Sequence, residues 1–75
     1  MTWEDFVLFV ENLRADFIAN QDKWTNTNID DYLEAVARYA KDLQGYYDNS
    51  GQTINANVPD WKTFSDILKG ATIYE

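Results

Sequence analysis

The densest group of residues that could do chemistry is a set of three carboxylates, Asp30, Asp31 and Glu34, near the start of a predicted helix. Asp30 and Glu34 are four positions apart, which places them on one helix face. Paired carboxylates can act as general acid and base, or bind a divalent ion. Carboxylates are also favoured in first helical turns by the helix dipole. We therefore favour helix support for this group, and a small metal-dependent or orphan enzyme that uses these carboxylates is the alternative.

Other catalytic and cofactor sites are excluded by residue type. The chain has no His and no Cys, so it cannot build a Ser-His-Asp or Cys-His site, a disulfide or the usual zinc site. Residues 48–52 resemble a calcium loop, but Gly51 is the fourth residue rather than the sixth, and no Glu follows at position twelve. The sequence thus predicts a protein that is not an enzyme and holds no cofactor or metal.

The charge balance limits the partners. Thirteen acids against six bases give a formal net charge of −7. Nucleic acids and anionic membranes need a basic footprint, so neither is an expected partner. A basic protein is compatible, because charge complementarity speeds association. Part of the acidity has a local explanation in two predicted ion pairs along helix faces, Glu34 with Arg38 and Asp66 with Lys69.

Three stretches place apolar residues at spacings of three and four, which is typical of amphipathic helices. They predict helices over residues 3–19, 28–47 and 59–69. No strand-like alternation is long enough to build a sheet. We therefore predict an all-α fold, a small three-helix domain over residues 1–75. Residues 71–74 could continue the third helix or extend away from it.

Each predicted helix has a start or stop signal. Thr2 with Asp5, and Thr27 with Asp30, have the spacing of a capping box. Pro59 fits a first helical turn, with Asn57 or Val58 as the cap. A turn over residues 48–51 ends the second helix.

The predicted core consists of the aromatic-rich stripes. The chain has three Trp, five Tyr and four Phe, and a domain of this size needs unusually good packing or dimerisation, so monomer and homodimer both stay open. Phe6, Leu33 and Trp61 are expected in this core, with roughly 2–5 kcal/mol lost on truncation. Trp24, in the first connection, should fold back as a plug, and Leu8 should be exposed.

The sequence resembles a family of small uncharacterised bacterial proteins over nearly its whole length. The residues that carry the resemblance are packing and capping residues, grouped as a Phe-rich first helix (Phe6, Phe9), a Trp-x-Asn turn (Trp24, Asn26), Tyr32-Leu33-Glu34-Ala35, and a Tyr74-Glu75 ending, with Leu13, Asp16, Ile29, Trp61, Phe64, Leu68 and Ala71. The resemblance implies a fold and no reaction. Families of this size sometimes include immunity proteins that neutralise toxins.

The favoured function is a non-enzymatic protein-binding module, immunity-like or regulatory. Its predicted binding surface is the face of the second helix that carries Asp31, Glu34, Tyr39, Asp42 and Tyr46. Tyr is enriched at protein interfaces, whereas a stacking platform for nucleic-acid bases would need a basic groove. The chain lacks Cys and any apolar run of about 20 residues, so we expect a soluble protein of the cytoplasm.

Overall fold

The computed structural model describes residues 1–74 and contains three α-helices and one turn of 3₁₀ helix. No strand occurs among these residues, so the prediction of a small all-α, three-helix fold is confirmed. The elements in chain order are α1 (Trp3–Ala19), η1 (Gln21–Lys23), α2 (Ile29–Asn49) and α3 (Trp61–Ala71).

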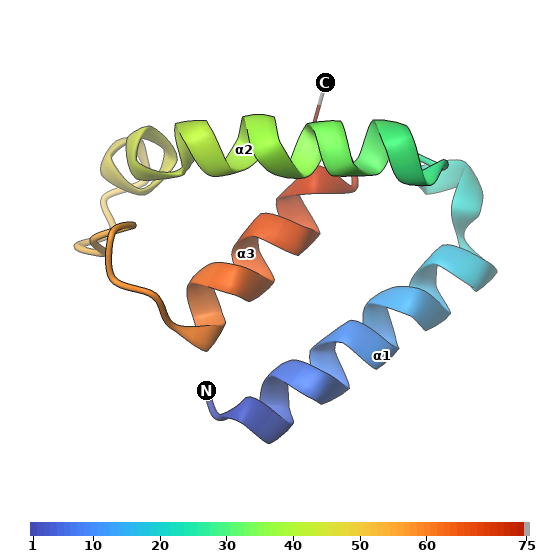
Figure 1. Cartoon of the computed structure of the whole chain (residues 1–75), viewed down its shortest axis with the longest axis horizontal. Coiled ribbons are helices and arrows are strands. Elements are labelled where there is room, and N and C mark those ends of the chain that lie inside the picture. The colour runs from blue at the N-terminus through green and yellow to red at the C-terminus, as the bar shows by residue number, and fades with distance from the viewer. Residues whose placement is uncertain (75) are drawn as a thin grey trace.

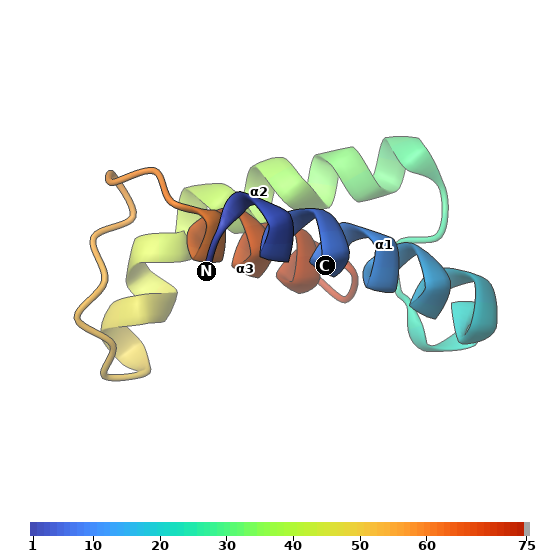
Figure 2. The same ribbon diagram turned by 90° about the horizontal axis from the view of Figure 1, so that it is seen from below.

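The last helix lies between the other two. α3 packs against both α1 and α2, whereas no Cα atom of α1 lies within 8 Å of one in α2 (Figure 1). The view from below shows the helices spread in a shallow arrangement, with overall extents of 33 × 29 × 19 Å (Figure 2). Because α3 is the shared partner, its two open sides form two separate surfaces between the outer helices.

The first helix begins and ends where the sequence predicts. The amide of Asp5 donates to Oγ1 of Thr2 (3.2 Å), and the Thr2 amide donates to a carboxylate oxygen of Asp5 (2.9 Å). These two bonds form a complete capping box. Leu8 is exposed, as predicted.

The second helix is capped by a different residue from the one predicted. The amide of Asp31 donates to Oδ1 of Asn28 (2.8 Å), so Asn28 is the cap, and the capping box predicted for Thr27 and Asp30 is wrong. Both Thr and Asn cap helices well, so the local sequence allowed either start. The helix ends at Asn49, two residues later than predicted.

The third helix begins two residues later than predicted. The carboxylate of Asp60 accepts a hydrogen bond from the amide of Thr63 (2.8 Å), which makes Asp60 the cap. Pro59 therefore precedes the cap instead of lying in the first turn. The predicted caps, Asn57 and Val58, lie further out in the connection.

The connection between α1 and α2 is pinned to the end of α3. The amides of Thr25 and Asn26 both donate to the carbonyl of Thr72 (2.9 and 3.3 Å). The Asn26 side-chain amide also donates to the carbonyls of Ala71 (2.9 Å) and Tyr74 (2.8 Å). These bonds resolve the alternative left open by the sequence, because Ala71 completes α3 and the residues after it form a turn rather than more helix.

Trp24 fills the corner where the three helices meet, as predicted. Its indole N–H donates to the carboxylate of Asp16 in α1 (2.8 Å). Its ring packs edge-on against Phe17, with centroids 5.0 Å apart, and lies 5.9 Å from the ring of Tyr32. The Tyr32 hydroxyl in turn donates to the carbonyl of Leu68 in α3 (2.8 Å), so one corner links all three helices.

The fully buried core is small and lies between α2 and α3. Its apolar members are Ala35, Leu43, Tyr47 and Ala71, and small polar residues complete it: Thr63, Ser65 and Thr72. No residue of α1 is fully buried.

The predicted core is therefore only partly correct. Leu33 is 57% exposed, because α2 turns the flank with Tyr32 and Tyr39, and not the flank with Leu33, towards α3. Phe6 is half-buried and packs against the ring of Trp61 (centroids 5.2 Å apart), which itself remains about one-third exposed.

Candidate functional site

The five residues predicted as a binding surface line two neighbouring hollows on α2. Tyr39, Asp42 and Tyr46 line a hollow of about 470 Å³. Asp31 and Glu34 line a smaller one of about 70 Å³. Tyr74, which the sequence analysis did not select, lines both. We call these six residues the α2 surface.

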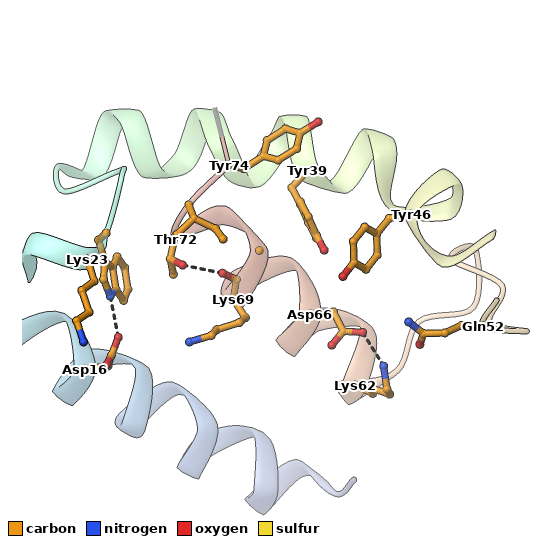
Figure 3. Close-up of a pocket in the computed structure, with 13 residues that line it drawn as sticks. Asp16, Lys23, Tyr39, Tyr46, Gln52, Lys62, Asp66, Lys69, Thr72 and Tyr74 are labelled. Atoms are coloured by element: carbon orange, nitrogen blue, oxygen red, sulfur yellow. Dashed lines mark hydrogen bonds and ion pairs between the residues drawn. The ribbon is translucent and has the colours of Figure 1, made fainter. Parts of the chain in front are cut away.

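Three tyrosine rings form the centre of the α2 surface. The ring of Tyr39 meets that of Tyr74 edge-on, with centroids 5.3 Å apart, and lies 5.9 Å from that of Tyr46. The Tyr74 hydroxyl donates a short hydrogen bond to the carboxylate of Asp42. Figure 3 shows the three rings one after another along α2. Tyr46 is the most exposed of them, at 53%.

Two acids of the α2 surface also serve the helix itself. Asp31 accepts a hydrogen bond from the Asn28 side chain (2.7 Å) and thereby completes the cap of α2. Glu34 forms the predicted ion pair with Arg38 at 2.6 Å, although both side chains are more than half exposed. An exposed pair of this kind contributes little stability.

The carboxylate group considered for metal binding does not converge on a site. Within residues 1–74, no three side chains of the types His, Cys, Asp and Glu come close enough together to hold a metal ion. Asp31 and Glu34 instead have the partners described above. The geometry therefore gives no support to a metal-dependent enzyme built on Asp30, Asp31 and Glu34.

A larger hollow of about 650 Å³ lies over the side of α3 seen in Figure 3, and the sequence analysis missed it. Three lysines from different parts of the chain line it: Lys23, Lys62 and Lys69. Lys62 pairs with Asp66 at 2.7 Å, so the pair predicted between Asp66 and Lys69 is wrong.

The second carboxylate of this larger hollow belongs to Asp16. Hydrogen bonds from Trp24 and Asn20 lower the pKa of Asp16, and the nearby charges of Lys69 and Lys23 lower it further. Each carboxylate thus has fixed donors, and the three lysines exceed the two carboxylates by one positive charge.

Tyr47 is the buried titratable group beneath these surfaces. Its hydroxyl donates to the carboxylate of Asp66 at 2.6 Å, and its side chain is almost inaccessible to solvent. Burial, followed by the hydrogen bond to Asp66, raises the pKa of Tyr47 to about 12. Deprotonation would place a buried phenolate beside a carboxylate.

This pKa predicts a loss of stability at alkaline pH. The unfolded chain releases the Tyr47 proton near pH 10, whereas the folded chain retains it to about pH 12, so stability falls with rising pH across that window. Two pH units correspond to about 2–3 kcal/mol. Urea unfolding between pH 9 and 12 should show a shallower loss for Tyr47→Phe than for the parent chain. The exposed control, Tyr46→Phe, should follow the parent, and an equal slope in all three chains would contradict this assignment.

None of the helices in the described part of the chain is both long enough and apolar enough to cross a membrane.

Comparison with known proteins identifies a family. The model of one family, described as "Family of unknown function (DUF7660)", matches residues 2–75. The chain therefore belongs to this family. No curated protein and no solved structure gave a match.

Proposed function

We propose that this member of the family of unknown function (DUF7660) is a non-enzymatic protein-binding module that binds a basic protein through the α2 surface. The observation that carries the proposal is the exposed ring of Tyr46 beside a hollow that Tyr39, Asp42 and Tyr74 also line. Exposed Tyr next to a pocket is the side-chain chemistry of interface hot spots. An immunity-like or regulatory role in bacteria is the form of binding that we favour, and the absence of Cys supports the cytoplasm as its compartment.

A basic side chain matches the hollow chemically. A Lys or Arg of the partner that enters it would approach the carboxylate of Asp42 and the faces of tyrosine rings, which attract cations. The net charge of −7 would draw such a partner towards the chain before contact. Lys41 also lines the hollow and would oppose a second cation, so we expect one basic anchor there.

Photo-crosslinking in cells that naturally contain the protein tests this proposal. A benzophenone amino acid replaces Tyr46 in one variant and Asn12, an exposed residue of α1, in the control. We expect position 46 to give one discrete adduct with a protein of basic pI, and position 12 to give none. Equal adduct patterns at the two positions would contradict the proposed surface.

Binding kinetics with the crosslinked partner then separate the contribution of the anchoring tyrosine ring from that of the surface charge. Tyr46→Ala should speed dissociation by about tenfold or more, because it removes an anchor ring. Glu34→Lys should instead slow association and weaken its dependence on salt. Unchanged rates in both variants would remove the α2 surface from consideration.

A further inference from the structure

The first helix has the composition of a buried helix but lies at the edge of the molecule. Apolar side chains occur all round α1, which is typical of a helix that is enclosed on every side. Among the long helices it packs only against α3, and none of its residues is fully buried. Its outer side therefore lacks a cover.

One flank of α1 carries an apolar stripe. The residues that form it follow each other at spacings of four and three, the period of a coiled-coil seam: Trp3, Val7, Val10, Arg14 and Phe17. Trp3 is 61% exposed, and Val7 and Val10 are each about 40% exposed. Arg14 is the only charged residue in the stripe.

The stripe continues into an apolar groove between α1 and the start of α2. This groove, of about 460 Å³, is lined by Val10 and Phe17 from α1, Ile29 and Tyr32 from α2, and Leu68 from α3. Ile29 is 71% exposed, and no acid among residues 1–74 lines the groove. We call Trp3, Val7, Val10, Phe17 and Ile29 the apolar face.

The groove beside this face and the larger hollow share Trp24 but take different residues from α3. Leu68 borders the groove, whereas Lys62, Asp66 and Lys69 border the hollow in Figure 3. The apolar face also shares no residue with the α2 surface. A cover on the apolar face would therefore leave the proposed binding surface free.

The solvent-accessible area of the chain indicates how much surface a binding partner would cover. The chain exposes 5327 Å². A folded monomeric protein of 8.7 kDa exposes about 4,700 Å² on average, so the excess is about 600 Å². A standard protein interface covers about 800 Å² on each partner. The excess is therefore close to the area that one stable interface would cover.

We propose that a second copy of this chain covers the apolar face, with the two α1 helices antiparallel about a twofold axis near Val10. Val10 is the centre of the stripe, so this pairing places Trp3 of one copy opposite Phe17 of the other, and each copy uses the same patch. Two chains of net charge −7 repel each other least across surfaces with few acids, and the described residues that line the groove include none. A chain of 75 residues without disulfides also gains stability most readily from oligomerisation.

Sedimentation equilibrium of the purified chain tests this proposal. We expect the mass of two chains at micromolar concentration. Val10→Glu should raise the dimer dissociation constant about 100-fold or more, because the twofold axis would then bring two carboxylates, one from each copy, together inside the interface. The matched control is Leu8→Glu, an exposed apolar position of the same helix outside the stripe, which should remain dimeric. A parent chain that is monomeric up to millimolar concentration, or equal dissociation in both variants, would overturn the proposal.

Disulfide formation between two copies of the chain tests the geometry of the proposed contact without introducing a charge. Because the chain has no Cys, Val10→Cys creates a single thiol, which a mild oxidant should couple to its copy across the twofold axis. Leu8→Cys should couple at least tenfold more slowly. Equal coupling at both positions would overturn the antiparallel arrangement, even if Val10→Glu fails to fold by circular dichroism.

Discussion

Leu43→Ala is expected to unfold a large fraction of the chain, whereas Leu33→Ala should leave its stability nearly unchanged. Leu43 is 2% exposed in the contact between α2 and α3, and emptying such a site costs about 2–5 kcal/mol. At about 0.05–0.15 kcal/mol per residue, a chain of 75 residues has about 4–11 kcal/mol to lose, so a chain near the lower end of this range would largely unfold. Leu33 is 57% exposed, so truncation removes few contacts.

Urea unfolding at one fixed protein concentration measures both changes, since the midpoint falls in proportion to stability when the slope is unchanged. The fixed concentration matters because a dimer gains stability by mass action. If Leu33→Ala lowers the midpoint as much as Leu43→Ala does, α2 presents the other flank to α3 and the core is wrongly assigned.

The sequence predicts which segments are helical much better than where the core lies. The spacing of apolar residues located all three helices, and it located both ends of α1. In α2, apolar residues from Ile29 to Tyr47 cover so wide an arc that their period does not define one buried direction. The direction is set by contacts distant in sequence, such as the hydrogen bond from Tyr32 to Leu68.

For a related reason, the sequence does not define which residue caps the start of α2. Thr27 and Asn28 are adjacent and both can cap a helix. Thr25 and Asn26, just before them, are held by the carbonyl of Thr72, far away in the sequence. A tertiary contact of this kind fixes the register in which the chain enters α2, and no local pattern encodes it.

The candidate site is also only partly predictable from the sequence. Helical spacing was enough to bring Tyr39, Asp42 and Tyr46 together on one stretch of α2. Tyr74 joins them only because the end of α3 is turned back by Asn26. Tyr74 belongs to the residues that carry the family resemblance, but its place beside Asp42 depends on the tertiary fold.

Gly70→Ala is expected to destabilise the chain, although alanine is the better helix former. A Cβ atom at position 70, inside α3, would lie closer than 3.0 Å to carbons of the Tyr39 ring. That ring is held between Tyr46 and Tyr74, so it has little room to move away. Overpacking of this kind costs about 1–3 kcal/mol, more than the gain of up to about 1 kcal/mol from helix propensity.

The sign of this effect should reverse when the ring is absent. In a Tyr39→Ala background, Gly70→Ala meets no side chain and should stabilise the chain by up to about 1 kcal/mol through helix propensity alone. Thermal unfolding of the parent, both single variants and the double variant therefore forms a double-mutant cycle, and we expect its coupling free energy to differ from zero. Stabilisation by Gly70→Ala in both backgrounds would mean that the Tyr39 ring moves aside freely. In that case Tyr39 would be a poor wall for the hollow on α2, and the preformed part of the binding surface there would consist of Asp42, Tyr46 and Tyr74.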